Sequence, residues 1–208
     1  MRILTFDTET TGFPNPNLPL DHSSQPYIVQ LAAELCEDDG RTLAQISTVI
    51  DNGIEIPETA AAVHGITTAR AAEIGVPPST ALELFIHFYN LAGLIVAHNI
   101  AFDMKMLEIA MARRAHCGVE PIDMSKPRFC TMEAATPILD IPPTPRMIAA
   151  GFIKPKAPKL EECIRHFFGE ELSGAHDAMV DVGGCKRVFF HLKTLGKVPD
   201  LTAAPAAA

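Results

Sequence analysis

Two acidic residues interrupt an apolar run near the start of the chain, RILTFDTETTGFP (2–14). Acidic residues are depleted in strand interiors, although the rest of this run is typical of a buried strand. Side chains alternate along a strand, so Asp7 and Glu9 share one face, whereas Leu4 and Phe6 point the other way. Two carboxylates about 7 Å apart repel each other unless a cation lies between them. The run therefore predicts a site for a hard cation such as Mg²⁺, with two solvated acids at a strand end as the simpler alternative.

The composition fits one domain with a substantial core. Of the 208 residues, 48% are hydrophobic and 20% are charged. The longest apolar runs, such as LAGLIVA (91–97), are too short to span a bilayer, and acids interrupt the apolar stretch at the N-terminus, unlike in a signal peptide. The five cysteines include no Cys-x-x-Cys, which favours reduced thiols. We therefore expect a cytoplasmic protein without membrane contact, with a single domain over 1–198 and a flexible tail over 199–208.

The charge is unevenly distributed along the chain. The formal net charge of −8 argues against a nucleic-acid partner. However, residues 1–104 carry 3 basic and 13 acidic side chains, whereas residues 105–165 carry 10 basic and 7 acidic ones. The basic residues of the second segment include Arg113, Arg114, Lys126, Arg128, Arg146, Lys154, Lys156 and Lys159. A solvated surface is the commoner explanation, so this distribution weakens the objection to nucleic acid without identifying a partner.

The hydrophobic pattern predicts one mixed sheet with helices packed on it. Alternation over 27–38 and 41–53, across a short Asp-Asp-Gly turn, predicts an antiparallel meander with the first strand. The apolar LIVAH (94–98) is typical of a buried parallel strand, and another strand is expected to begin at 127. One helix is expected between Pro77-Pro78 and a stop at Gly93, and others are expected over about 99–115, 160–168 and 177–195.

Helix boundaries and breakers add detail to this arrangement. Thr80 with Glu83 predicts a capping box at the start of the first helix, and Asn99 is expected to cap the second. A Pro-rich insertion over about 137–158 contains six prolines and is expected to be a long irregular loop. Gly183-Gly184 lies inside the last helix, where it either permits close packing or loosens that turn.

Two further acids and a histidine lie at the starts of predicted helices. Asp103 ends AHNIAFD (97–103), in the first turn of the helix that follows the apolar strand. His176 and Asp181 belong to GAHDAMVD (174–181), at the start of the last helix. An acid in a first helical turn is favoured by the helix dipole, so each residue alone has an ordinary explanation.

Together, four motifs in this order resemble the DEDDh, or DnaQ-like, group of 3′–5′ exonucleases. This group includes the proofreading epsilon subunit of bacterial DNA polymerase III. The motifs are FDTETTG (6–12), VHGIT (63–67), HNIAFD (98–103) and HDAMVD (176–181). The resemblance extends from residue 3 to about residue 192. It implies an α/β, ribonuclease H-like fold with a mixed five-stranded sheet, an antiparallel meander and flanking helices.

The resemblance implies a metal-dependent 3′–5′ exonuclease that releases nucleoside monophosphates from single-stranded DNA. Two divalent cations, Mg²⁺ or Mn²⁺, would assist phosphodiester hydrolysis, and carboxylates are the ligands that they prefer. By resemblance, Asp7 bridges both ions, Glu9 and Asp181 bind the ion nearer the attacking water, and Asp103 serves the second ion. His176 would then act as the general base for that water.

The resemblance also implies a pocket for the 3′-terminal nucleotide. Its expected lining consists of the backbone of Thr10 and Thr11 and the side chains near His64, Ile66, Asn99 and Phe102. Phe102 suits stacking on any base, although a core-facing aromatic is an equal alternative. His64 has an ordinary alternative as a loop or cap residue.

Several alternatives remain for the function. A 3′–5′ exoribonuclease would use the same site, so RNA is an alternative substrate to the preferred DNA. A non-catalytic nucleic-acid-binding module would share the fold, although such modules typically lose a metal ligand or the base. A phosphohydrolase for small nucleotides would need a closed pocket. No convincing glutamine-led hydrophobic tail suited to a sliding clamp is found, so membership in a replicase is unsupported. A polymerase partner and a homodimer both stay open as alternatives that no sequence feature supports.

Overall fold

The computed structural model describes residues 1–114 and 122–199. Its strands form one mixed sheet in the order β3-β2-β1-β4-β5, in which β1–β2 and β2–β3 are antiparallel and β1–β4 and β4–β5 are parallel. The strands are β1 (Ile3–Thr10), β2 (Ile28–Cys36), β3 (Thr42–Val49), β4 (Leu94–Ala97) and β5 (Arg128–Cys130). The predicted meander and the mixed five-stranded sheet of a ribonuclease H-like fold are thus confirmed.

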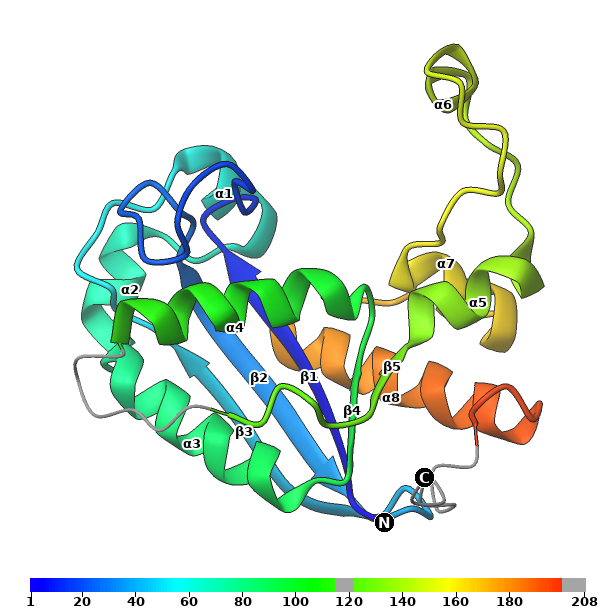
Figure 1. Cartoon of the computed structure of the whole chain (residues 1–208), viewed down its shortest axis with the longest axis horizontal. Coiled ribbons are helices and arrows are strands. Elements are labelled where there is room, and N and C mark those ends of the chain that lie inside the picture. Colours follow the sequence, from blue (N-terminus) through cyan, green and yellow to red (C-terminus); the bar gives the residue numbers. More distant parts are fainter. Residues whose placement is uncertain (115–121, 200–208) are drawn as a thin grey trace, which may run out of the picture.

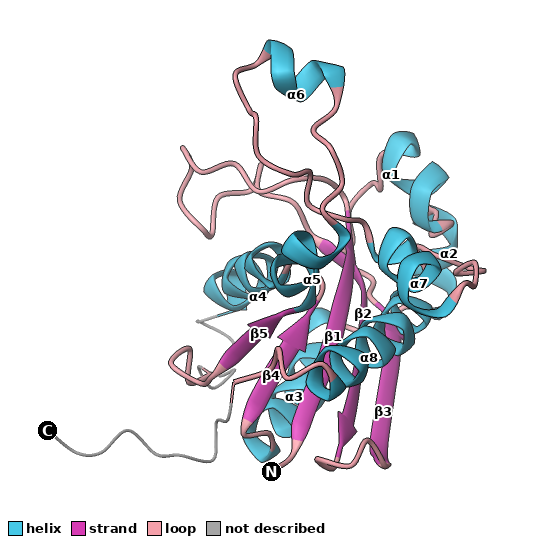
Figure 2. Ribbon diagram, turned by 90° about the vertical axis from the view of Figure 1, so that its right-hand side faces the viewer, coloured by secondary structure: helices cyan, strands magenta, loops and turns pink. Residues whose placement is uncertain are grey.

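Helices cover both faces of the sheet (Figures 1 and 2). On one face lie α3 (Pro78–Leu91) and α4 (Ile100–Arg114), and on the other lie α5 (Thr131–Leu139), α7 (Leu160–Phe168) and α8 (Ala178–Thr194). Leu4 and Phe6 pack in the core beneath α3 and α4, whereas Ile3 packs beneath α8, as the alternation along β1 predicts. Consequently, the face of β1 that carries Asp7 and Glu9 is the face that α8 covers.

Two short helices that the sequence pattern did not predict precede α3: α1 (Glu58–His64) and α2 (Thr68–Ile74). The VHGIT motif forms the junction between them. Gly65 ends α1 with a φ of 73°, which is in the left-handed region that favours glycine. Thr67 then caps α2 by accepting a hydrogen bond from the Arg70 N–H at 3.1 Å. No residue of α1 is buried, so its hydrophobic periodicity is too weak to reveal a helix.

Two of the predicted helix starts differ from the structure. The capping box of Thr80 and Glu83 is wrong, because α3 already begins at Pro78, where the missing N–H costs nothing. Asn99 precedes α4 as expected, but with a φ of 70° instead of the extended conformation of a usual N-cap. The predicted end of this helix at residue 115, like residues 200–208 of the predicted tail, lies outside the described residues.

The Pro-rich insertion is more ordered than an irregular loop. Its first residues complete α5, which contains Pro137, and the short helix α6 (Pro145–Ala149) lies within it. Thr144 caps α6 by accepting a hydrogen bond from the Met147 N–H at 3.3 Å. In both views the segment that carries α6 projects away from the rest of the molecule (Figures 1 and 2).

The glycine pair in α8 has one member with a packing role. A Cβ atom at Gly184 would lie 3.2 Å from Leu160 Cδ2 of α7, so this glycine permits close contact between the two helices. A Cβ atom at Gly183 would meet nothing within 4 Å. None of the helices described here is long and apolar enough to cross a membrane.

Candidate active site

The five residues predicted to be catalytic converge at the carboxyl end of β1. Two come from β1 itself, one from the first turn of α4, and two from the start of α8 and the turn before it. All five line one cleft of about 610 Å³, namely Asp7, Glu9, Asp103, His176 and Asp181. Segments separated by more than 150 residues along the chain therefore meet in a single site.

On the α4 side of the cleft, Asp103 is held rigidly. Its side chain is buried, with 3% exposed, and its Oδ1 atom accepts hydrogen bonds from the N–H of Thr8 at 3.1 Å and from the Thr8 hydroxyl at 2.7 Å. Thr8 neighbours Asp7 on the opposite face of β1, so the strand presents the Asp7 carboxylate on one face and supports the Asp103 carboxylate from the other. Burial raises the pKa of Asp103 to about 7, although the Thr8 hydrogen bonds act to lower it.

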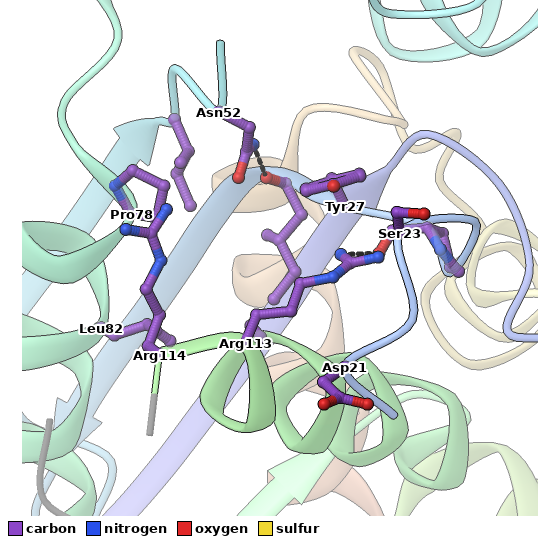
Figure 3. A pocket seen from close by; sticks show the side chains of 12 residues that line it. Asp21, Ser23, Tyr27, Asn52, Pro78, Leu82, Arg113 and Arg114 are labelled. Atoms are coloured by element: carbon purple, nitrogen blue, oxygen red, sulfur yellow. Dashed lines mark hydrogen bonds between the residues drawn. The ribbon is translucent and has the colours of Figure 1, made fainter. Parts of the chain in front are cut away.

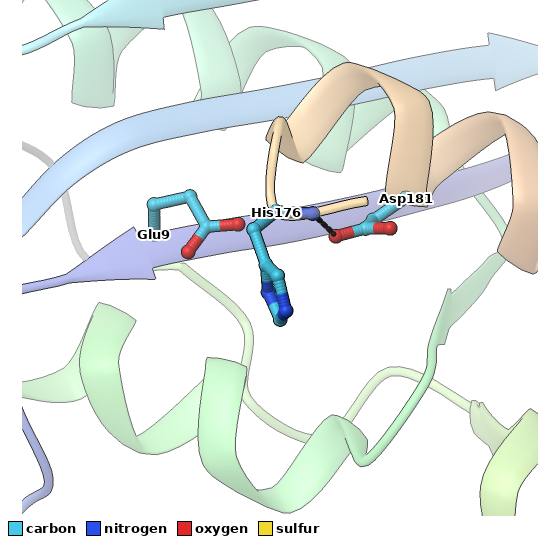
Figure 4. Close-up of side chains that lie close together, drawn as sticks. All are labelled: Glu9, His176 and Asp181. Carbon is cyan, nitrogen blue, oxygen red and sulfur yellow. Dashed lines mark hydrogen bonds between the residues drawn. The ribbon is translucent and has the colours of Figure 1, made fainter. Parts of the chain in front are cut away.

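On the α8 side, His176 and Asp181 are arranged by a turn. His176 is exposed and has a φ of 71°, and its main-chain N–H donates to Asp181 Oδ2 at 3.0 Å. Asp177 caps α8 by accepting a hydrogen bond from the Met179 N–H at 2.9 Å. Potential ligand atoms of Glu9, His176 and Asp181 lie within 4.8 Å of one another. Figure 4 shows the Glu9 and Asp181 carboxylates on either side of His176.

Burial raises the pKa of all four carboxylates, and the charges of neighbouring acids add to it. Burial raises the pKa of Asp7 well above its ordinary value, and the charges of Asp103, Asp181 and Glu9 add to the effect. Burial, followed by the Asp181 and Asp103 charges, raises the pKa of Glu9 to about 8. Burial likewise raises the pKa of Asp181. Within the described ranges, no Lys or Arg forms an ion pair with any of the four. A set of oxygen ligands with uncompensated charge fits divalent cations such as Mg²⁺ or Mn²⁺.

Five of the six residues predicted around the terminal nucleotide also line the cleft: Thr10, Thr11, His64, Asn99 and Phe102. Ile66 is placed differently. Its side chain is 4% exposed and packs in a small core cluster with Val29, Ile56 and Ala71. Ile66 therefore supports the junction between α1 and α2 from beneath.

The residue just after β1 makes hydrogen bonds with the residue that precedes β2. The N–H of Thr11 donates to the Tyr27 carbonyl at 2.9 Å, and the Thr11 hydroxyl oxygen accepts from the Tyr27 N–H at 2.9 Å. The hydroxyl of Thr10 donates to the Gly12 carbonyl at 2.9 Å. The N–H of Thr11 is thus already used within the protein.

His64 has a donor in the cleft wall that lies near the Thr10 main chain but makes no hydrogen bond of normal geometry with the described residues. Its Nδ1 atom accepts a hydrogen bond from the Ile66 N–H at 3.1 Å, so the neutral ring carries its proton on Nε2. The Nε2 atom is buried and has no hydrogen-bond partner among the described residues. Burial lowers the pKa of His64, while the nearby main chain of Thr10 acts to raise it. An unpartnered buried donor is costly unless a ligand uses it.

Sequence reasoning missed other residues that line the cleft. Phe13, directly after FDTETTG, is 87% exposed, and its ring meets that of Phe102 edge-on with the centroids 5.9 Å apart. The available signal in the sequence was an aromatic residue directly after FDTETTG. The helix α1, which the sequence pattern did not predict, also lines the cleft through Thr59, Ala60 and Val63.

A second cleft of about 330 Å³ lies near the C-terminal part of α4 (Figure 3). The Arg113 guanidinium in its wall lies 3.7 Å from the centroid of the Tyr27 ring and donates to the carbonyls of His22, Gln25 and Pro26. These bonds hold the loop before β2 against α4. Arg113 thus has a structural role in this cleft. The candidate active site is the larger cleft, which the predicted catalytic residues line.

Residues 4–189 match the model of an exonuclease family, the RNase T exonucleases. The chain belongs to this exonuclease family. The match covers all four motifs and confirms the resemblance to DnaQ-like 3′–5′ exonucleases.

Relatives of this exonuclease family member include a DNA polymerase III subunit epsilon-like protein of Rhodobacter capsulatus. It is 33% identical over 109 residues, which is 51% of this chain and 14% of the relative. E. coli exonuclease I in complex with a dT13 oligonucleotide aligns with a TM-score of 0.70 at 18% identity, over 93% of this chain and 41% of that one. Exonuclease I from Methylocaldum szegediense aligns with a TM-score of 0.68 at 17% identity, over 93% and 40%. The chain thus spans less than half of each of these proteins, and the two solved structures share its fold.

Proposed function

We propose that this chain is a metal-dependent 3′–5′ exonuclease that removes nucleotides from the 3′ ends of single-stranded DNA. The observation that carries the proposal is the convergence of Asp7, Glu9, Asp103 and Asp181 with His176 at the end of β1. Burial and the charges of neighbouring carboxylates raise the pKa of Asp7 and of Glu9, and bound cations would offset that charge.

The four carboxylates would hold two divalent cations. When bound, such ions activate a water and stabilise the charge on the phosphate and the leaving oxygen. Asp7 lies between the α4 and α8 sides of the cleft and is assigned to both ions. Glu9 and Asp181 are assigned to one ion and Asp103 to the other. The two hydrogen bonds from Thr8 hold Asp103 in place for this role.

His176 is assigned the role of general base. The hydrogen bond from its main-chain N–H to Asp181 holds the turn, and its exposed side chain can reach a water in the cleft. An imidazole near neutral pH can accept the proton of the attacking water and release it to solvent. Its exposure at the rim favours this exchange.

The terminal nucleotide would bind between the end of β1 and α1. Phe102 and Phe13 offer aromatic surfaces for a base, and stacking of this kind tolerates any sequence. The Nε2–H of His64 offers a donor to a phosphate or sugar oxygen. The solved complex of E. coli exonuclease I with dT13 supports single-stranded DNA as the substrate. An exoribonuclease would use the same acids.

The test uses strands of equal sequence in DNA and RNA, each labelled at either end. Mononucleotides released from the 3′ end in Mg²⁺, none in chelator, and intact circular single strands are expected. Full activity in excess chelator would contradict the metal mechanism, and cleavage of circles would indicate an endonuclease. If the RNA strand were degraded faster, RNA would be the preferred substrate, and equal rates would show no preference for DNA. Binding to strands without any hydrolysis would favour the non-catalytic module.

A further inference from the structure

Residues 141–157 form a projecting hairpin, here called the arm, with α6 at its tip (Figures 1 and 2). Its base is closed by a hydrogen bond from the Lys156 N–H to the Ile141 carbonyl at 2.8 Å. Its tip is closed by a bond from the Phe152 N–H to the Met147 carbonyl at 2.9 Å, across Gly151 with a φ of 83°. The arm therefore has a defined shape although it projects from the molecule.

The arm is rooted beside the active-site cleft. His98, which lines the cleft, makes a hydrogen bond through Nε2 with the carbonyl of Pro158, the residue that follows the arm, at 3.0 Å. The other ring nitrogen pairs at 2.9 Å with the hydroxyl of Thr131, at the start of α5, which leads into the arm. In Figure 2 the arm rises beyond the end of the sheet toward which β1 points. The cleft lies at the same end, because Glu9 and Thr10 at the end of β1 line it.

Most basic side chains near the middle of the chain form hydrogen bonds or ion pairs within the protein. Arg113 and Lys126 donate to main-chain carbonyls, as does Arg128. Lys156 and Lys159 pair with Glu162 and Glu161.

The two basic side chains at the arm's tip are free. Arg146 and Lys154 make no side-chain hydrogen bond or ion pair with the part of the protein that the structure describes. Residues 141–157 contain three basic and no acidic residues in a chain with a net charge of −8. The tip is thus complementary to an anionic partner.

The same tip exposes large apolar side chains. Ile148 is 55% exposed, Phe152 is 63% exposed, and Ile153 is 81% exposed. Clustered apolar exposure of this kind usually marks a contact surface. An aromatic ring flanked by free basic groups is the combination that single-stranded nucleic acids favour, because bases stack on the ring and phosphates meet the cations.

We propose that the arm binds the single strand on the 5′ side of the terminal nucleotide. In this arrangement Phe152 stacks on a base, and Arg146 and Lys154 contact phosphates. The inference rests on the proposed function, because it places the arm on the strand whose 3′ end enters the cleft. The arm then adds affinity for strands long enough to reach it and leaves hydrolysis at the end of β1 unchanged.

The test compares two arm variants, Phe152→Ala and Arg146→Ala/Lys154→Ala, with wild-type protein. Substrates are a trinucleotide and a strand of about 20 nucleotides. We expect KM for the long strand to rise about tenfold in each variant, with kcat and the trinucleotide kinetics unchanged. Loss of two phosphate contacts should reduce the slope of log K against log salt by about 1.4, whereas Phe152→Ala should leave the slope unchanged.

The matched control is Arg2→Ala/Arg41→Ala, which removes two positive charges near the opposite end of the sheet, where both residues approach Glu37. The control should retain the wild-type slope. Equal KM values for wild type and arm variants on the long strand would overturn the proposal, as would an equal loss in the control. A dimer that the arm variants dissociate, with strand affinity unchanged, would assign the arm to a second copy instead.

Fluorescence anisotropy on the same strands separates this proposal from the proposed function. If wild-type protein degrades no strand, the exonuclease assignment fails, but tighter binding of the long strand that requires the arm still supports the inference. If wild-type protein degrades strands and the arm variants bind the long strand as wild type does, the arm inference alone fails. Thermal unfolding of each variant confirms that the fold is intact.

Discussion

On the α4 side of the cleft, Asp103 is buried and accepts two hydrogen bonds from Thr8. On the α8 side, His176 is exposed, and the Asp181 carboxylate accepts a hydrogen bond from the main-chain N–H of His176. On the α4 side, buried hydrogen bonds thus hold the carboxylate in position, whereas on the α8 side a turn at the surface holds the groups. This difference suits a site in which a metal ligand must stay fixed while a proton acceptor exchanges with water.

The largest effect is expected from Asp7→Asn, because Asp7 is the residue proposed to serve both sides of the cleft. The substitution removes a charged oxygen assigned to two cations. The loss of kcat should exceed the roughly 10²–10⁴-fold expected for a general base, and metal affinity should fall as well. Single-turnover rates together with metal titration measure both quantities. A variant that kept full metal affinity would show that Asp7 is not a shared ligand.

His176→Ala should reduce the rate by about 10²–10⁴-fold with metal affinity nearly intact. The control is His176→Asn, because asparagine tolerates the left-handed conformation that this position requires, at a φ of 71°. Equal losses in both variants indicate that the imidazole matters. Recovery in His176→Asn would mean that the turn, and not proton transfer, limits the alanine variant.

Thr8→Val tests the α4 side more gently. It removes the hydroxyl bond to Asp103 at 2.7 Å and keeps the main-chain bond at 3.1 Å. Thr8 is a positioning residue, and loss of such support typically costs about 10–100-fold in metal affinity or activity. Excess Mg²⁺ should restore much of the rate. Thr136→Val is the matched control, because that hydroxyl bonds only within α5, to the Met132 carbonyl. An unaltered Mg²⁺ dependence in Thr8→Val would contradict the supporting role.

Removal of metal should expose the charge repulsion between the two sides. In the folded protein the pKa is raised to about 8 for Glu9 and to about 7 for Asp103. At pH values between the ordinary pKa of each acid and its raised pKa, the folded protein therefore binds more protons than the unfolded chain. The stability of metal-free protein should therefore fall as pH rises through this window. Tm measured in chelator from pH 5 to pH 9 checks the sign. Added Mg²⁺ should raise Tm most at the upper end, and a Tm that rises with pH would contradict the repulsion.

The smallest effects are expected from substitutions of the two glycines within α8, which change the helix and leave the preceding turn unchanged. Gly183→Ala should stabilise the protein by up to about 1 kcal/mol, because alanine favours helix and a Cβ atom there meets nothing within 4 Å. Gly184→Ala should destabilise it, because the new Cβ atom would press on Leu160. Denaturant unfolding measures both changes. Activity altered by Gly183→Ala would mean that flexibility of the helix, and not only of the turn, matters on the α8 side.

The sequence by itself determined the sheet and which acids and histidine meet at the end of β1. Alternation along β1 placed Asp7 and Glu9 on one face, and the structure has them on the face that α8 covers. The meander, the parallel strand β4 and the acids in the first turns of α4 and α8 also follow from local patterns. These features depend on periodicity and chain order, which neighbouring residues specify.

Only the tertiary structure decided which residues support, line or extend the site. The Thr8–Asp103 bonds join residues 95 positions apart, and no local pattern reveals them. Ile66 was predicted in the pocket, but it is buried because the junction of α1 and α2 turns it toward Val29. Lys154 and Lys156 look alike in the sequence, yet only Lys156 meets Glu162. The availability of a side chain for a ligand depends on its partners, and folding brings those partners from distant parts of the chain.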